Sequence, residues 1–435
     1  MTILNRIKKI SQKILPSFLI RGYHFLLVFL GAIIYRFPGK KLRMIGVTGT
    51  NGKSTVVEMI SQILEEAGFR VASFSSIRFK IGKEVKENVL KMTMPGRFFL
   101  QKLLRQAADA NCHYVVLETT SEGIKQHRHQ FIDFEMAVFT NLSAEHIEAH
   151  GSFEKYRRAK EKLFERTKKI HIINLDDKNV KHFLKYKAEE KYGYSLGIIN
   201  LNSPLTNNKI PEYKVQATDY RISARGVAFK VGDTEFTLKL LGAFNIYNAL
   251  AAICVGLSQN IALTICKQAL EKMEVVPGRM ETVISEPFSV IVDYAFTPAA
   301  LEKVYQTLKA TSSHQQVPRL ICVLGAAGGG RDQWKRPILG GLAAQYCNDV
   351  IITNEDPYDE DPAGIINQIA QGAGQKGVKI LDRREAIRES LRKAQPGDTV
   401  VITGKGSEPF ICVAGGKKIA WDDREVVREE FNNLR

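Results

Sequence analysis

Residues 44–60 read MIGVTGTNGKSTVVEMI, and this stretch decides the fold. The apolar run at 44–47 predicts a buried strand, and the apolar spacing after Lys53 predicts a helix over 54–67. The glycine-rich turn between them frees backbone N–H groups at a helix start, an arrangement that wraps phosphate oxygens. Lys53 would pair with the outer phosphates and Ser54 would hold Mg²⁺. The stretch therefore predicts a nucleoside triphosphate site, although Val47 stands where the strict G-x-x-x-x-G-K-[ST] pattern requires glycine.

The same strand–helix alternation continues along the chain. Short apolar runs at 113–120, 136–142 and 171–177 predict strands, and 153–166 has helical spacing. This alternation predicts an α/β fold in which helices cover a mostly parallel sheet. Ligands of such sheets bind at the carboxyl ends of the strands, where the phosphate loop, Glu118 and Asn141 all fall.

The second half of the chain predicts a further domain. Period-two alternation within 205–240 predicts a small antiparallel insertion, and Pro277-Gly278 breaks the chain before a new apolar strand at 289–295. We expect a helical segment over 1–43, a P-loop ATP-binding domain over 44–276 and a Rossmann-like α/β domain over 277–435. A chain of 435 residues is long enough for two or three domains.

Composition indicates the cellular compartment and the kinds of partner to expect. The six cysteines are scattered without C-x-x-C spacing, which favours a reducing cytoplasm over a zinc site or a disulfide framework. The net charge is +16, but no nucleic-acid-binding motif is present, so we expect no nucleic-acid partner. We also expect a monomer.

The first 43 residues are unusual because they hold nine Lys or Arg and no Asp or Glu. They surround an apolar run at 25–35, which is shorter than the roughly 20 residues that a spanning helix needs. We expect residues 1–37 to contact a membrane surface, as a peripheral element at the inner face. The alternatives are a helix that packs on the protein's own body and a true span.

Two segments carry a resemblance to a known family. TGTNGKST (48–55) and FTNLSAEHIEAHGSFEKYRRAKEKLF (139–164) resemble the corresponding motifs of the Mur ligases, ATP-dependent amide-forming enzymes of peptidoglycan synthesis. The resemblance implies that Lys53, Glu118, His146 and Lys160 form the catalytic set. It also implies Mg²⁺ held by Ser54, Glu118, His146 and Lys160, with Lys160 carbamylated.

Other segments resemble the tripeptide synthetase branch of that family (MurE). VVLETTSEGIKQHR (115–128) and MTMP (92–95) match its acceptor segments, although Met94 departs from the pattern. This implies acceptor binding by Thr93, Ser121, Gln126 and Arg128. The implied ATP-binding residues are Thr48, Gly49, Thr50, Asn51, Gly52, Lys53, Ser54, Thr55, Asn245, Arg279 and Asp293. That branch usually begins with a uridine-nucleotide-binding domain of about a hundred residues, which the 43 residues here do not resemble.

The last third carries the motifs for the incoming amino acid. VDYAFTPAALEKV (292–304), GRDQWKRP (330–337) and GDTVVITGKGSEPF (397–410) match the family, with Phe296 and Ser407 as departures at histidine positions. The implied amino-acid site is Arg331, Asp356, Tyr358, Gly404 and Glu408. In TNEDPYDEDP (353–362), Tyr358 occupies the position where ligases for diaminopimelate carry an arginine that grips the distal carboxylate. Acidic Asp356, Asp359 and Glu360 would instead suit a distal amine, so L-lysine is favoured and diaminopimelate stays open.

The resemblance thus implies an ATP-dependent carboxylate–amine ligase that adds an amino acid to a muramoyl peptide through an acyl phosphate. Three alternatives remain from the sequence. The same chemistry would serve a lipid-linked or folate-like acceptor, an amidating relative would use ammonia, and a membrane-bound scaffold would bind ATP without turnover.

Overall fold

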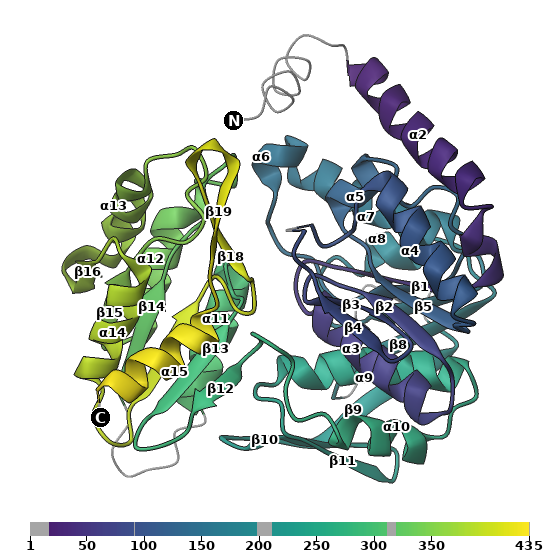
Figure 1. Cartoon of the computed structure of the whole chain (residues 1–435). Coiled ribbons are helices and arrows are strands. Elements are labelled where there is room, and N and C mark those ends of the chain that lie inside the picture. Colours follow the sequence, from purple (N-terminus) through teal and green to yellow (C-terminus); the bar gives the residue numbers. More distant parts are fainter. Residues whose placement is uncertain (1–16, 91, 198–210, 311–318, 435) are drawn as a thin grey trace.

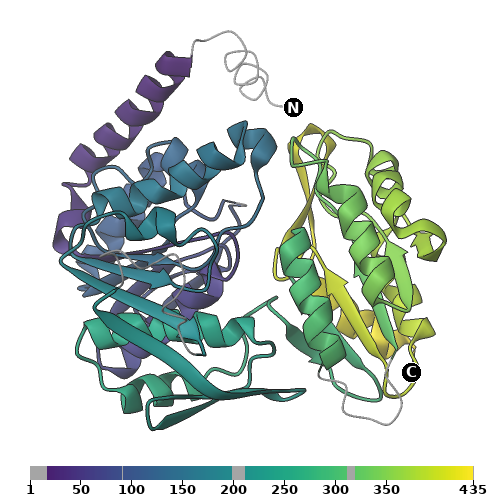
Figure 2. The ribbon, with the colours of Figure 1, turned by 180° about the vertical axis from the view of Figure 1, so that it is seen from behind.

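The structure, a computed structural model, describes residues 17–90, 92–197, 211–310 and 319–434. They form two β-sheets with helices on both faces, which lie side by side in Figures 1 and 2. The larger sheet belongs to the first part of the chain and the smaller sheet to the last third.

The larger sheet is built around the strand that precedes the phosphate loop. β1 pairs in parallel with β5 on one side and β6 on the other, and the full order is β11-β10-β9-β8-β7-β6-β1-β5-β2-β3-β4. The strands are β1 (Arg43–Thr48), β2 (Val71–Phe74), β3 (Arg78–Ile81), β4 (Glu84–Glu87), β5 (Tyr114–Glu118), β6 (Phe134–Phe139), β7 (Ile170–Asn174), β8 (Glu190–Leu196), β9 (Tyr213–Ser223), β10 (Gly226–Val231) and β11 (Thr234–Leu238).

The expected antiparallel insertion at 205–240 is only half right. β10 does pair antiparallel with β9 and β11. However, β9 pairs in parallel with β8, so these strands extend the main sheet and do not form a separate unit. Residues 205–210 of the expected segment lie outside the described residues.

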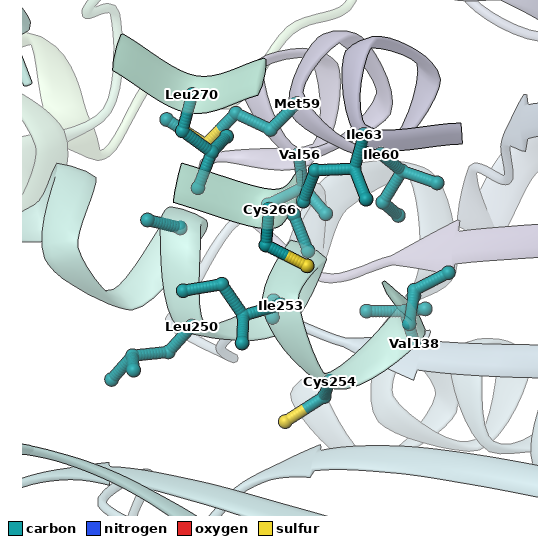
Figure 3. Close-up of a cluster of buried hydrophobic side chains, with 14 of the residues drawn as sticks. Val56, Met59, Ile60, Ile63, Val138, Leu250, Ile253, Cys254, Cys266 and Leu270 are labelled. Atoms are coloured by element: carbon teal, nitrogen blue, oxygen red, sulfur yellow. The ribbon is translucent and has the colours of Figure 1, made fainter. Parts of the chain in front are cut away.

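Helices cover both faces of this sheet because alternate residues of each strand point to opposite sides. Ile45 and Val47 pack with the helices α3 (Lys53–Glu66), α9 (Phe244–Ser258) and α10 (Leu263–Glu271), whose apolar contacts appear in Figure 3. Met44 packs on the opposite face with α4 (Arg97–Asp109) and α7 (Phe153–Arg166). Short helices complete this part: α5 (Ser121–Lys125), α6 (Ile147–His150) and α8 (Lys181–Leu184).

The helix α2 (Ser17–Ile34) lies at the edge of the molecule (Figure 1) and is followed by the 3-10 turn η1 (Pro38–Lys41). Its inner face packs on α4: Val28 and Ala32 are fully buried, and the Tyr35 and Phe98 rings meet at 5.3 Å. Its outer face is an exposed apolar stripe of Leu19, Tyr23, Leu26, Leu30, Ile33 and Ile34. Of the described helices, none combines the length and apolar character needed to cross a bilayer.

The second sheet has the order β12-β13-β17-β14-β15-β16, with β12 antiparallel and the rest parallel. Its strands are β12 (Glu281–Ile284), β13 (Ser289–Asp293), β14 (Leu320–Leu324), β15 (Asp349–Ile352), β16 (Gly377–Lys379) and β17 (Thr399–Thr403). α11 (Pro298–Ala310), α12 (Lys335–Tyr346) and α13 (Pro362–Ala373) pack on one face, and α14 (Arg383–Lys393) and α15 (Asp423–Asn433) on the other. A hairpin of β18 (Phe410–Val413) and β19 (Lys417–Ala420) and the 3-10 turns η2 (Gly374–Lys376) and η3 (Ala414–Gly416) complete it. The α/β fold expected from the sequence is confirmed.

Candidate active site

A cavity of about 620 Å³ runs between the two halves at the carboxyl ends of the strands. It brings together residues from both halves that the sequence analysis placed in one site. The expected site residues that line it are Thr50, Asn51, Gly52, Lys53, Ser54, Thr55, Thr93, Glu118, Ser121, Gln126, Arg128, His146, Lys160, Asn245, Arg279, Asp293, Arg331, Asp356, Tyr358, Gly404 and Glu408. Thr48 and Gly49 do not line it: Thr48 is fully buried at the end of β1, and the Gly49 carbonyl accepts from Lys160 Nζ.

The phosphate loop is held in shape from the neighbouring strand. Asn51 donates its backbone N–H to Asn141 Oδ1 at 3.0 Å, and its carbonyl accepts from Thr140 Oγ1 at 2.8 Å. Gly49 has φ +149°, and a Cβ there would lie 1.9 Å from Thr140 Oγ1, so this position requires glycine. The loop then enters α3 at Lys53 with its backbone N–H groups at the helix start, as an anion site requires.

Lys53, Ser54 and Glu118 form one connected cluster. Ser54 Oγ donates to Glu118 Oε2 at 2.8 Å, and Lys53 Nζ lies 3.8 Å from Glu118 Oε1. Lys53 Nζ also donates to its own loop, at Thr50 O, at 2.8 Å. Burial lowers the pKa of Lys53, an effect that Glu118 opposes. The cluster thus places an ammonium, a hydroxyl and a carboxylate beside the phosphate loop.

Lys160 and His146 occupy the same cavity, close to several cations. Lys160 is 2% exposed, and its Nζ donates to Gly49 O at 2.6 Å. Burial, followed by the neighbouring Lys53 charge, lowers the pKa of Lys160 well below its ordinary value. Burial and the cations Arg331, Lys160, Lys335 and Lys53 lower the pKa of His146 to about 2. His146 is therefore neutral at physiological pH, the form of imidazole that binds metals.

A Mg²⁺ ion fits the donor chemistry of this cluster. A hydroxyl and a carboxylate, Ser54 and Glu118, already lie in contact beside a phosphate loop, and Mg²⁺ prefers oxygen ligands shared with phosphates. Throughout the described ranges, no three His, Cys, Asp or Glu side chains gather closely enough to hold a metal by themselves. The expected set therefore depends on Ser54 and Lys160 in addition to Glu118 and His146.

The residues of the second half that were expected to bind ATP shape one wall of the cavity. Asp293 accepts backbone N–H groups of Met280 at 2.7 Å and Ala295 at 2.6 Å, and burial raises its pKa. Arg279 stacks 4.2 Å from the Tyr294 ring centroid and donates to Ser76 Oγ at 3.3 Å. In the first half, Asn245 accepts from Asn248 Nδ2 at 2.9 Å. Asp293 thus shapes the segment 279–295 through its backbone contacts.

The expected acceptor residues gather at another part of the cavity. Gln126 Oε1 accepts from Arg128 at 2.8 Å, and Arg128 also donates to the backbone carbonyl of Met94. Ser121 Oγ contacts His150 Nε2 at 3.1 Å. Thr93 lines the cavity beside them.

The amino-acid end differs from the sequence expectation at its acidic residues. Asp356 pairs with Lys405 at 2.8 Å and accepts from the Cys412 backbone N–H. Asp359 accepts from the Gly415 backbone N–H at 3.0 Å, and Glu360 pairs with Arg336 at 2.9 Å. These carboxylates already have internal partners, which the sequence did not indicate, and the choice of amino acid stays a prediction.

Two other charges remain at that end. Glu408 accepts from Tyr294 OH at 3.0 Å and pairs with Lys405 at 2.8 Å. The Arg331 guanidinium makes no hydrogen bond or ion pair with any residue that the structure describes. Burial lowers the pKa of Arg331, but the charges of Tyr294, Tyr358, Glu145 and Glu408 raise it overall, so a substrate carboxylate would meet a cation with acidic neighbours.

Sequence reasoning missed the ion pair of Glu145 and Lys335. The pair joins the two halves at 2.8 Å, and both side chains are almost fully buried. Asp332 supports it by accepting the backbone N–H groups of Ile147 at 3.3 Å and Glu148 at 3.0 Å. Lys335 lies in the GRDQWKRP segment, and Glu145 lies next to His146. Both motifs were identified in the sequence, but nothing in the sequence indicates that these two side chains meet.

Comparison with known families gives two matches. The Mur ligase middle domain matches residues 47–256, and the Mur ligase glutamate ligase domain matches residues 278–406. A UDP-N-acetylmuramyl-tripeptide synthetase of Roseiflexus sp. (strain RS-1) is 36% identical over 433 residues, covering 93% of this chain and 81% of that protein. A UDP-N-acetylmuramoyl-L-alanyl-D-glutamate–2,6-diaminopimelate ligase of Caldanaerobacter subterraneus is 38% identical, covering 91% of this chain and 79% of that protein.

Solved structures agree with these matches. A UDP-N-acetylmuramoyl-L-alanyl-D-glutamate–2,6-diaminopimelate ligase aligns with a TM-score of 0.58 at 32% identity, over 90% of this chain and 79% of that chain. A folylpolyglutamate synthase of Mycobacterium tuberculosis aligns with a TM-score of 0.70 at 16% identity, over 87% of this chain and 92% of that chain. At that identity the second likeness concerns the fold alone.

Proposed function

This chain belongs to the Mur ligase family, as its motifs predicted, and on that premise we propose that it joins a muramoyl-peptide carboxylate to the amine of an amino acid at the expense of ATP. The observation that carries the proposal is the single cavity in which the phosphate loop, the Ser54–Glu118 cluster and Arg331 meet. Residues 44–276 would bind ATP and residues 277–435 the amino acid. The product would enter peptidoglycan precursor synthesis.

The reaction follows from the charges in the cavity. An acceptor carboxylate oxygen attacks the γ-phosphorus of ATP, the bond to ADP breaks, and an acyl phosphate forms. The amine then attacks the acyl carbon and loses a proton, and phosphate leaves as the amide forms. Lys53 and the loop N–H groups stabilise the phosphate charge during transfer. Ser54, Glu118 and His146, together with Lys160, would hold Mg²⁺, which would supply further neutralisation of phosphate charge.

We propose that Lys160 is carbamylated. Its amine is fully buried beside Lys53, and the neutral amine that this environment favours is the form that adds to CO₂. The neutral nitrogen forms a bond to the carbon of CO₂ and releases a proton, so an uncharged buried amine becomes an anion. The carbamate would attract the Lys53 ammonium and supply another oxygen ligand for a bound metal.

The choice of amino acid rests on Arg331 and Tyr358. Tyr358 stands where an arginine would bind a distal carboxylate, so L-lysine stays favoured and diaminopimelate stays open, although Asp359 and Glu360 already have internal partners. Arg331 would bind a substrate carboxylate, with Asp356, Gly404 and Glu408 around the amine. Thr93, Ser121, Gln126 and Arg128 would hold the acceptor. We propose a monomer, since one chain supplies all of these groups.

We further propose that residues 1–37 contact the inner surface of the membrane, so that the protein is peripheral. The outer stripe of α2 has no charged residue, and exposed Arg36, Lys40 and Lys41 follow it directly. An apolar stripe beside basic residues fits an anionic bilayer surface. A lipid-linked acceptor would then arrive on the side of the molecule that α2 occupies.

The test is phosphate release by the purified full chain with ATP and Mg²⁺, in a matrix of substrates. UDP-linked or lipid-linked muramoyl dipeptide forms one axis, and lysine, diaminopimelate or ammonia forms the other. We expect turnover only when both an acceptor and an amino acid are present, and a loss of about 10²–10³-fold in Lys53→Ala. A native protein that is silent across the matrix would reject the proposal and favour an ATP-binding scaffold.

A further inference from the structure

Three basic side chains from separate elements meet beside the acceptor end of the cavity. His24 comes from α2, Arg97 is the first residue of α4, and Arg128 follows α5. Arg97 donates to His24 Nδ1 and, at 3.1 Å, to Gln126 Oε1. Arg128 donates to the same Gln126 oxygen at 2.8 Å, so one amide oxygen bridges two guanidinium groups. Gln126 and Arg128 line the cavity.

Neither guanidinium group forms an ion pair with a described carboxylate, although Glu122 accepts from Gln126 Nε2 at 2.7 Å and its charge opposes the lowering of the Arg128 pKa. Among the described residues, three arginines are buried: Arg336 pairs with Glu360, Arg383 pairs with Asp423, and Arg128 has no ion pair. Arg128 is 8% exposed, and its Nε is buried without a hydrogen-bond partner. Burial and the neighbouring Arg97 lower the pKa of Arg128 to about 10, and burial also lowers the pKa of Arg97.

A buried cation without an ion pair is costly, and an anion that binds there lowers the cost. The backbone adds to the attraction, because α4 begins at Arg97 with no side chain capping its first N–H groups. Burial and the two arginines also lower the pKa of His24 to about 4, so His24 is neutral and serves as an acceptor that orients Arg97.

We propose that Arg97 and Arg128, oriented by His24 and Gln126, form a subsite for the diphosphate group that links the acceptor to its carrier. The inference rests on the proposed function and extends it from the peptide to the carrier. Planar guanidinium forks suit phosphate oxygens in bidentate contacts. A nucleotide diphosphate and a lipid diphosphate share this chemistry, and the test distinguishes them.

Binding of two diphosphates to the full chain tests the subsite directly. The phosphate loop is first filled with a non-hydrolysable ATP analogue and Mg²⁺, and UDP or geranyl diphosphate is then titrated by calorimetry. The variant is Arg97→Gln, and the matched control is Arg105→Gln, on the same helix but paired with Asp109. We expect native-like binding in the control and at least tenfold weaker binding in Arg97→Gln.

Equal binding by the native protein and Arg97→Gln would overturn the subsite, as would a native protein that binds neither diphosphate. The tighter of the two ligands identifies the carrier class. If Arg97→Gln fails to fold by circular dichroism, Arg97→Lys replaces it, because lysine keeps the charge and loses the fork. We expect Arg97→Lys to bind the diphosphate more weakly than the native protein does. Unchanged binding in this variant would count against the subsite.

Kinetics separate this inference from the proposed function. In Arg97→Gln, we expect KM to rise for a carrier-linked acceptor while kcat, and KM for carrier-free muramoyl dipeptide, stay at native values. If the native protein turns over and Arg97→Gln has the same KM for the carrier-linked acceptor, the subsite is wrong and the proposed function still stands. A native protein without turnover would reject the function, and the diphosphate titration would still decide the subsite.

Discussion

Glu145 Oε1 and Lys335 Nζ lie 2.8 Å apart although 190 positions separate the two residues in the chain. The side chains are 3% and 4% exposed, and each comes from a different half of the molecule. Burial raises the pKa of Glu145, while Lys335 opposes that rise. The pair therefore ties the phosphate-loop half to the amino-acid half inside the cavity.

Lys335→Met should destabilise the protein by about 3–5 kcal/mol, because it leaves Glu145 as a buried charge without a partner. Urea unfolding of the full chain measures the loss. The control is Lys239→Met, which removes one partner of an exposed pair with Glu274 and should cost no more than about 1 kcal/mol. If Glu145→Gln does not recover part of the loss in the Lys335→Met background, the buried-charge explanation is wrong.

Lys160→Ala should abolish turnover, and a short carboxylate such as formate should restore part of it by occupying the space of a carbamate. The companion variant Lys162→Ala, exposed on the same helix, should retain native turnover. In the native protein, NMR with ¹³C-bicarbonate should show a carbamate carbon that is missing in Lys160→Ala. Identical spectra for the two proteins would exclude carbamylation at this position.

The folded protein should lose stability as the pH falls below about 6.5, the ordinary histidine pKa. Burial lowers the pKa of His129 to about 3 and of His171 to about 4. Between these values and 6.5 the unfolded chain binds more protons, so stability rises with pH in that window and falls on acidification.

His129→Gln should flatten this dependence, because one such histidine costs about 2 kcal/mol between pH 6.5 and 5 at about 1.4 kcal/mol per pH unit. Denaturant midpoints of the native protein and the variant at several pH values measure the slope. Parallel curves for the two proteins would show that His129 is not held neutral.

Leu26→Glu, in the outer stripe of α2, should lower flotation of the full chain with anionic vesicles at least fivefold. Charging the stripe removes apolar burial and adds repulsion from the lipid. Ile419→Glu provides the control, since Ile419 is 52% exposed on the distant hairpin. Flotation should also weaken with salt and be weaker on neutral vesicles. Equal flotation of both variants would remove the membrane role of α2.

Features set by neighbouring residues were predictable from the sequence. The helix α7 spans the residues expected for it, because FEKYRRAKEKLFER has helical spacing and Ser152 caps it by accepting from the Lys155 N–H. The alternation of strands and helices also predicted that the phosphate loop and Glu118 lie at the same edge of the sheet. Most candidate site residues met in one cavity for the same reason.

Features that depend on distant partners were not predictable. The parallel pairing of β9 with β8 needs information from beyond the local alternation. Asp359 and Glu360 looked available in sequence, but their partners come from η3 and α12. The inner face of α2 packs on α4, as the packing interpretation expected, while the exposed outer face leaves the membrane interpretation a prediction.

The hydroxyl of Ser54 has a neighbour beyond Glu118. Ser76 Oγ lies 2.8 Å from it, and Arg279, next to the Pro277-Gly278 break between the halves, donates to that same Ser76 oxygen. A Ser54 that turns toward a nucleotide-bound ion gives up this contact and leaves Arg279 with a loosened anchor. Two hydroxyl groups thus connect the phosphate loop directly to the segment at which the second half of the chain begins.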